Sequence, residues 1–342
     1  MILEFILLVL TVALFLYAFL AGADFGAGIL QLLPIGISKE KKMDFIGKAM
    51  GPVWEANHIW LILALVISFN AFPDIFWFIS EYFHFPLGAL VIGIIFRGAS
   101  FTFLHYDPIK DRSEKIYHWI FGLSSIWCTM WIGIIVGSVM LGNFSLEDKE
   151  IYPRYFEHWL NPFAIMMGIF ITNLMMFNAS LFLYLETRED KHQWLKVTGR
   201  VLLLTIISGA LVHISLFIQN ANRWMLFFSN GLSLTLIMLS FFLLFPQYYF
   251  IKNNYRKSSR LLAGTQLLAI MAAGFAPLFP KVILFRDNSS FDIYAKAAEP
   301  EVLRLLAIAL AVGCVFILPS YFYLLKIFKA QDQKFERDVK KG

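Results

Sequence analysis

The segment Leu3–Ala23 reads LEFILLVLTVALFLYAFLAGA, and Glu4 is the only charged residue in it. An α-helix rises about 1.5 Å per residue, so about 20 apolar residues cross the hydrocarbon core of a bilayer. The segment lacks the strict alternation of polar and apolar residues that is typical of a half-buried strand. Backbone groups in lipid must pair within their own segment, which favours a helix. The segment is therefore predicted to be a transmembrane helix.

Comparable apolar runs recur along the chain and predict an all-α integral membrane protein with nine transmembrane helices. We expect a single transmembrane domain over residues 1–342. Within it, short connections favour a first four-helix bundle over about 1–141, a second over about 160–280 and a peripheral ninth helix at 302–327. The nine predicted spans are Leu3–Leu33, Val53–Phe72, Ile75–Phe96, Ile116–Leu141, Pro162–Leu185, Val201–Ile218, Trp224–Phe250, Leu261–Pro280 and Val302–Ile327.

The composition excludes a soluble enzyme. Hydrophobic residues make up 59% of the chain and charged residues 15%, whereas a soluble domain has about 45–50% apolar and about 25% charged residues. The sequence contains no phosphate loop, HExxH motif, nucleophile elbow or dinucleotide fingerprint, so no catalytic residue and no metal ligand is predicted. The two cysteines, Cys128 and Cys314, lie in apolar runs and are expected to be small buried hydrophobic residues.

The basic residues predict the orientation in the membrane. The formal net charge is +5, but the basic residues do not form one surface that would suit nucleic acid. Of the 29 Lys and Arg residues, 22 lie in alternate connections and in the tail, and 7 lie in the remaining connections. Basic residues accumulate on the cytoplasmic side, so the N-terminus is predicted outside and the C-terminus inside. The basic segments are 39–48, 97–115, 188–200, 252–260 and 326–341.

Asp24 is the first ionisable residue inside a predicted span. It lies in the run Ala21-Gly22-Ala23-Asp24-Phe25-Gly26-Ala27-Gly28. A charged group within a membrane costs about 2.5–3.5 kcal/mol on insertion scales, which makes Asp24 a candidate functional residue. The three glycines permit close helix approach. Packing of small residues around one polar anchor is therefore an equally good interpretation of this run.

The second candidate is the stretch Gly51-Pro52-Val53-Trp54-Glu55-Ala56-Asn57-His58-Ile59-Trp60. Pro52 suits the first turn of a helix, where its missing N–H has no intrahelical partner to lose. Glu55 and His58 are three residues apart, as are Trp54 and Asn57, so these side chains share adjoining helix faces. Glu55 is a candidate proton carrier. A Glu–His hydrogen bond that only fixes helix packing remains the alternative.

Arg97 is the third candidate, in Phe96-Arg97-Gly98-Ala99-Ser100-Phe101. The predicted topology puts Asp24, Glu55 and Arg97 in the inner half of the membrane, where opposite charges could pair. The alternative for Arg97 is an interfacial anchor whose aliphatic stem lies along the lipid. His84 and His213 are weaker candidates, because a lone histidine in a span is more often a packing residue.

Three motifs occur in the order found in one known family. The stretch Gly51–Ile62 resembles the G-P-V-W-[DE]-x-N-x-x-W-L segment of subunit II of cytochrome bd oxidases. The run Asp24–Gly28 is similar to that family's first-helix motif, and Phe96–Phe101 resembles its F-R-G-x-x-F stretch. The length and the nine-span topology fit over the whole chain.

The resemblance implies a bacterial cytoplasmic membrane protein that serves as a supporting subunit of a quinol oxidase. In that family subunit I carries two b-type haems, one d-type haem and the quinol site, and oxygen is reduced to water with protons from the cytoplasm. No cofactor is assigned to this chain, although some members hold a structural quinone in subunit II. Subunit I, membrane lipid, quinone and in some complexes a small single-span subunit would be its partners, and nucleic acid would not.

The resemblance also implies roles for single residues. Glu55 would help to deliver protons, with His58 and Asp24 as further members of the route. Some members have an acidic residue where this chain has His58, and histidine can itself relay protons. Trp54, Asn57 and Arg97 would support the route by polar contacts and packing.

Two other functions remain open from the sequence. A proton-coupled secondary transporter would line an alternating-access path with Asp24, Glu55 and Arg97, but transporters usually have broken helices in repeat-related pairs near the midplane. A purely structural assembly subunit would use the same charges for helix packing alone.

Overall fold

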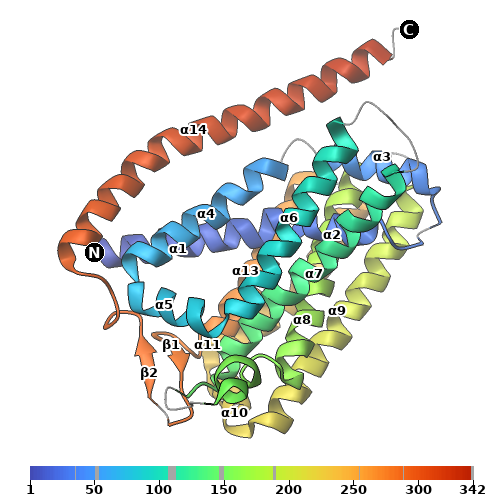
Figure 1. The fold of residues 1–342 in the computed structure, drawn as a ribbon. Helices are drawn as coiled ribbons and strands as arrows, with labels where there is room; N and C mark the ends of the chain where they lie inside the picture. Colours follow the sequence, from blue (N-terminus) through green and yellow to red (C-terminus); the bar gives the residue numbers. More distant parts are fainter. Residues whose placement is uncertain are drawn as a thin grey trace.

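The structure is a computed structural model that describes residues 1–34, 36–50, 54–106, 113–145, 150–187, 190–253, 255–287 and 289–339. Figure 1 shows an almost entirely helical molecule, in which α6 to α9 run side by side and one long helix, α14, crosses the outside. The all-α prediction is confirmed.

The first predicted span is one continuous helix with a local change of pitch. It comprises α1 (Ile2–Leu16), a π-helical turn η1 (Tyr17–Ala21) and α2 (Gly22–Leu30). Every residue of α2 is buried. At Gly26 an added Cβ would lie 2.1 Å from the carbonyl oxygen of Met175 in α8. The glycine is therefore what allows α2 to approach α8 so closely.

The chain turns sharply where the sequence predicted the end of one span and the start of the next. After α3 (Lys39–Met50), α4 (Trp54–Ala71) and α5 (Pro73–Tyr82) meet at 115°. Phe72 adopts φ −136° and ψ 59°, because a residue before proline is disfavoured in the α-helical region. The helix then restarts with Pro73 in its first turn, where a missing N–H is tolerated.

The predicted third span, Ile75–Phe96, is wrong in its position. Its first part belongs to α5, and the membrane-length helix is α6 (His84–Tyr106). The helices separate at Phe83, which has φ −105° and ψ 21°. Glu81 and His84 make this junction polar, and the His84 Nδ1 lies 2.9 Å from the Glu81 carbonyl oxygen.

The centre of the molecule is formed by α7 (Ser113–Leu141), α8 (Pro162–Glu186) and α9 (Lys191–Gln219). The helix α8 packs against both α7 and α9 and also against α2. The side chain of Asn161 caps α8 by accepting a hydrogen bond from the Ala164 N–H at 2.9 Å. Because α8 contacts helices of both predicted bundles, the division into 1–141 and 160–280 stays a prediction.

The predicted span Trp224–Phe250 is wrong at its start. The structure has α10 (Ala221–Ser229), α11 (Gly231–Phe242) and α12 (Leu244–Lys252), and only Gly231–Lys252 is a membrane-length segment. The Asn230 side chain accepts a hydrogen bond from the Ser233 N–H at 2.9 Å. Asparagine at this position starts a new helix. The next helix, α13 (Arg256–Phe275), packs against α11.

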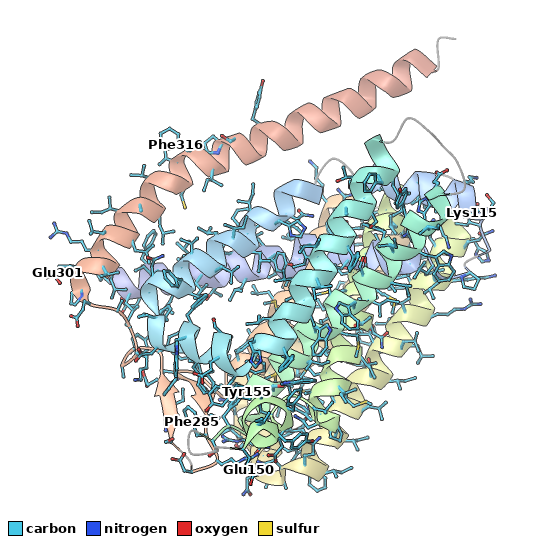
Figure 2. The ribbon with its side chains drawn as sticks, viewed as in Figure 1. Lys115, Glu150, Tyr155, Phe285, Glu301 and Phe316 are labelled. Carbon is cyan, nitrogen blue, oxygen red and sulfur yellow. The ribbon has the colours of Figure 1, made fainter. Side chains whose placement is uncertain are left out.

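A short hairpin and the long last helix complete the chain. The strands β1 (Lys281–Leu284) and β2 (Ser290–Asp292) are antiparallel. The helix α14 (Pro300–Val339) packs on α1 and α4, where Leu303 and Leu310 are buried. Figure 2 shows Phe316 pointing away from the bundle, and it is 69% exposed. The peripheral position of the ninth predicted helix agrees with this arrangement.

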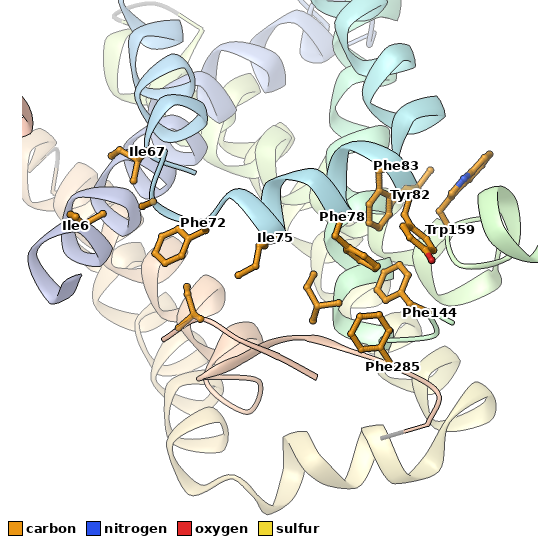
Figure 3. Close-up of a cluster of buried hydrophobic side chains, with 14 of the residues drawn as sticks. Ile6, Ile67, Phe72, Ile75, Phe78, Tyr82, Phe83, Phe144, Trp159 and Phe285 are labelled. Atoms are coloured by element: carbon orange, nitrogen blue, oxygen red, sulfur yellow. The ribbon is translucent and has the colours of Figure 1, made fainter. Parts of the chain in front are cut away.

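An aromatic cluster joins the hairpin to the helices at one end of the molecule. Figure 3 shows the rings of Phe78, Tyr82, Phe144 and Phe285 packed together. The Phe78 ring centroid lies 4.3 Å from that of Tyr82 and 5.1 Å from that of Phe144. His158 contributes its Nε2, which lies 2.8 Å from the Tyr82 carbonyl oxygen. We call this group the outer aromatic cluster, after its predicted side of the membrane.

Seven helical segments of the described residues are long and apolar enough to cross a membrane, or eight if the bent pair α4–α5 is one span. The helix α13, which carries Arg256, Lys257, Arg260 and Gln266, is not among them. Lys115 and Glu150, from connections predicted on opposite sides, lie at opposite ends of the molecule (Figure 2). The number nine and the side that each end faces stay predictions.

Candidate polar site in the membrane-spanning region

A buried ion pair links α2 and α6. Asp24 in α2 and Arg97 in α6 approach to 2.7 Å between Asp24 Oδ2 and Arg97 Nη2, and each side chain is 1% exposed. The expected pairing of these two residues is confirmed. In the continuous first helix from Ile2 to Leu30, Asp24 lies nearer to the end that leads toward the basic segment 39–48, and Arg97 lies in the second half of α6, whose end leads toward Lys110, Arg112 and Lys115. The pair therefore occupies the half of the bundle next to those segments.

Three neighbours hold the Arg97 guanidinium in place. Its Nε donates a hydrogen bond to the Ser125 Oγ at 3.0 Å. Its Cζ lies 4.6 Å from the centroid of the Phe25 ring and 4.5 Å from that of Phe121. A cation over an aromatic face is stabilised by about 2 kcal/mol when the site is desolvated. Arg97 is thus an interior residue, and the alternative of an interfacial anchor is wrong.

Gly28 makes room for Ser125 in this arrangement. A Cβ at Gly28 would lie 2.3 Å from the Ser125 Oγ, so any larger residue would displace the hydroxyl that Arg97 needs. The Ser125 hydroxyl in turn donates to the Phe121 carbonyl oxygen at 2.7 Å. The glycine run therefore serves the ion pair as well as the contact of α2 with α8.

The helix α4 brings Asn57 and His58 to the same region. Asn57 is 1% exposed, and His58 is partly buried. The His58 ring centroid lies 6.3 Å from that of Tyr17 in η1. The side chains of Trp54 and Glu55, the residues singled out most strongly by the sequence, lie outside the part of the chain that the structure describes. Their backbone belongs to the first turn of α4.

Sequence reasoning missed Tyr17 and Ser125. The Tyr17 ring packs edge-on against Phe25 at 6.5 Å between centroids, and Phe25 lies under the Arg97 guanidinium. A polar aromatic residue seven positions before Asp24 could have been noticed as a helical neighbour at two turns. The π-turn changes the angular position of Tyr17, however, and no sequence feature gives that turn. Ser125 looks like any hydroxyl in a helix.

The π-turn is supported by a polar contact from α8. The Asn178 Nδ2 donates a hydrogen bond to the Phe19 carbonyl oxygen at 2.8 Å. A π-turn disturbs the regular i to i−4 ladder and leaves carbonyl groups that need other donors. Asn178 supplies one of these donors. Turns of this kind are frequent at functional sites.

The weaker histidine candidates lie elsewhere. His84 is bonded at the α5–α6 junction, and His213 in α9 packs against Phe228 at 5.5 Å between ring centroids. Within the described ranges, no three His, Cys, Asp or Glu side chains come together in a way that could hold a metal ion. Cys128 is buried beside Leu90, and Cys314 is partly exposed on α14.

Comparisons with known proteins agree with one another. The family profile described as cytochrome bd terminal oxidase subunit II matches residues 2–328. The chain is similar to cytochrome bd ubiquinol oxidase subunit 2 of Bacillus subtilis, at 22% identity over 92% of this chain and 91% of that protein. It is also similar to cytochrome bd-I ubiquinol oxidase subunit 2 of Escherichia coli, at 24% identity over 58% of this chain and 52% of that protein.

A solved structure has the same fold. A chain of the bd oxidase from Geobacillus thermodenitrificans superposes with a TM-score of 0.75 at 18% sequence identity, and the match covers 96% of this chain and 98% of that chain.

Proposed function

Because the chain belongs to the cytochrome bd terminal oxidase subunit II family, we propose that it is the haem-free second subunit of a quinol:oxygen oxidoreductase. It is a multi-pass protein of the bacterial cytoplasmic membrane and a subunit of a terminal quinol oxidase. The proposal assigns it two tasks, which are to support a haem-bearing subunit I and to take up protons from the cytoplasmic side for the reduction of oxygen.

The buried Asp24–Arg97 pair is the observation that supports the proton task most directly. A fully buried ion pair is a costly way to join helices, since desolvation of the charges often exceeds their attraction. Its position next to the basic segments would let protons enter from the predicted cytoplasmic side. We propose a route that starts at Glu55 and includes His58 and Asp24, with Trp54, Asn57 and Arg97 as supporting residues.

The partner would hold the redox groups. Two b-type haems, one d-type haem and the quinol site are assigned to subunit I, and haem iron there would carry the electrons from quinol to oxygen. This chain would contribute proton-carrying side chains and an apolar surface. A structural quinone and a small accessory subunit are further candidates for binding to it.

One feature favours the transporter as a second candidate function. The bend of 115° between α4 and α5 makes this pair a broken span or a re-entrant loop, and broken helices are common in transporters. The bend lies at Phe72, however, at the end of α4 that is far from Asn57 and His58. A transporter would need the break and the polar groups at the same depth. The oxidase subunit is therefore the better supported function.

Purification of the chain in its native membrane separates these functions. The oxidase proposal predicts that a tag on this chain brings down a haem protein with the absorbance of b- and d-type haems. A stable, colourless protein that moves solutes across vesicles would show that it is a transporter instead.

The substitution Glu55→Gln tests the proton task against pure assembly. Without a titratable proton at this position, oxygen consumption should slow roughly tenfold to a hundredfold. A positioned proton-transfer group typically contributes about a hundredfold or more, and this loss lies at the lower end of that range. Haem content should stay near that of the unaltered complex. Turnover is measured with an oxygen electrode and haem by its absorbance.

Glu81→Gln provides the matched control, since Glu81 lies in α5 at the other end of the bundle. It should leave turnover unchanged. Normal turnover of the Glu55→Gln complex would leave assembly as the role of this chain.

A further inference from the structure

Four buried polar atoms near the ion pair have no hydrogen-bond partner among the protein groups that the structure describes. They are Tyr17 OH, Asp24 Oδ1, Asn57 Oδ1 and Arg97 Nη1. Tyr17 is 8% exposed and the other three residues are 1% exposed. A buried polar atom left unpaired costs about 1–3 kcal/mol, and most such atoms in proteins are paired. Four in one region therefore indicate a ligand.

These four residues belong to segments that pack together. Tyr17 contacts Phe25, whose ring lies under Arg97, and it also contacts His58, the neighbour of Asn57 in α4. The turn η1 packs against both α2 and α4. Tyr17 is within electrostatic reach of both Asp24 and Arg97. The four unpaired atoms thus come from η1, α2, α4 and α6, which meet around the ion pair.

The chemistry of the four atoms restricts the ligand. The Asp24 carboxylate and the Asn57 amide oxygen accept hydrogen bonds, Arg97 Nη1 donates, and the Tyr17 hydroxyl can do both. The charges of Asp24 and Arg97 already balance. A cation would add positive charge beside the guanidinium, and an anion would add negative charge beside the carboxylate. The ligand must therefore be small, neutral and able both to donate and to accept, which describes water.

We propose that Tyr17, Asp24, Asn57 and Arg97 hold a cluster of ordered water, and that the Tyr17 hydroxyl is a positioning residue for the proton route. Buried waters typically make about three hydrogen bonds to otherwise unsatisfied groups, and the four atoms offer enough partners for such a cluster. A proton can pass along it when each oxygen accepts one proton and releases another, so the cluster itself is unchanged. The presence of the water does not depend on the proposed function, whereas its role in proton transfer rests on that function.

The first test is direct observation of the water in the intact oxidase. Cryo-electron microscopy of the whole complex should show solvent density within hydrogen-bond distance of both Tyr17 OH and Asp24 Oδ1. In the Tyr17→Phe complex the density next to the lost hydroxyl should disappear while the fold is retained. Side chains that pair directly with each other, with no solvent between them, would overturn the proposal whatever the variants do.

The second test is the kinetic effect of the same substitution. Tyr17→Phe should lower oxygen consumption roughly 3- to 10-fold, the equivalent of about one hydrogen bond, and should increase the ratio of rates in H₂O and D₂O. Tyr82→Phe is the matched control, because it removes a buried hydroxyl that donates to the Ser145 carbonyl oxygen at 2.9 Å in the outer aromatic cluster. It should leave the rate and the isotope ratio unchanged.

The two tests separate this inference from the proposed function. Water density together with normal turnover of Tyr17→Phe would refute Tyr17 as a positioning residue, even if Glu55→Gln is slow. A slow Tyr17→Phe complex with an increased isotope ratio supports the inference. Normal turnover of both Glu55→Gln and Tyr17→Phe would refute proton uptake by this chain and, with it, the proposed role of the water in proton transfer.

Discussion

The two ends of the helical bundle are held together by different physical interactions. The end next to the basic segments uses an ion pair, a serine hydroxyl and glycine contacts around Asp24 and Arg97. The outer aromatic cluster uses the rings of Phe78, Tyr82, Phe144 and Phe285. Apolar packing depends on area and shape, so it tolerates substitution. A buried charge does not, because removal of one partner leaves the other unpaired.

The contrast between the two ends indicates which end holds the functional residues. Packing of rings joins α5, the hairpin and the helix ends in the outer aromatic cluster, and Tyr82 adds buried hydrogen bonds with Ser145 and His158. A charged pair is not needed for that purpose. Its presence in the half of the bundle next to the basic segments therefore favours a role other than helix packing.

The largest expected effect comes from Arg97→Met, which removes the charge and keeps a long side chain. Asp24 then remains as an unpaired buried carboxylate, and the complex should lose about 3–5 kcal/mol of its free energy of unfolding. Thermal unfolding of the purified complex measures this loss. The double variant Arg97→Met/Asp24→Leu should recover most of it. A double variant as unstable as the single one would show that the unpaired charge is not the cause.

A smaller effect is expected from Phe78→Leu in the outer aromatic cluster. The substitution keeps an apolar side chain but loses the ring contacts with Tyr82, Phe144 and Phe285. The free energy of unfolding should fall by about 1–2 kcal/mol, because the side chain changes shape and aromatic pairs are lost, but no charge is left unpaired. The same thermal measurement applies. A loss equal to that of Arg97→Met would contradict the distinction between the two ends.

The smallest effect is expected from Asp74→Asn. The Asp74 carboxylate and the Lys296 ammonium lie 2.9 Å apart, and both side chains are substantially exposed. Exposed ion pairs contribute between zero and about 1 kcal/mol and are weakened by salt, so we expect a shift below about 0.5 kcal/mol. Lys296→Gln should give the same small shift, and the double variant should add nothing. A large shift that persists in high salt would mean that solvent does not screen this pair.

Helix type and approximate position could be predicted from the sequence, because apolar runs of membrane length have few alternatives. The errors occur where local backbone chemistry interrupts such a run. Pro73 turns α4 into α5, and Asn230 starts α11 inside a predicted span. Proline and asparagine are both common at helix starts, but hydropathy alone does not reveal a helix start inside an apolar run.

The site was predictable in part. Asp24 and Arg97 could be found because a charge in an apolar run is conspicuous, and their opposite signs suggested the pair. Ser125 could not be found, because a serine hydroxyl in a helix usually bonds to its own backbone, and Tyr17 could not be placed, because no sequence feature gives the π-turn that holds it. What distinguishes them is the arrangement of α7 and η1 around Arg97, which depends on contacts between segments far apart in the chain.

The π-turn at Tyr17–Ala21 inserts a phase shift into the first helix. Successive residues of an α-helix are about 100° apart, and a π-turn holds about one residue more than an α-turn. Everything after Ala21 is thereby rotated relative to everything before Tyr17. The side of α1 that packs on α4 and the side of α2 that carries Asp24 are thus set independently of each other. Regular α-helical winding of the same residues would turn the Asp24 carboxylate about 100° away from Arg97, whereas deletion of one residue within the turn would remove the extra residue and leave the two faces close to their present orientation.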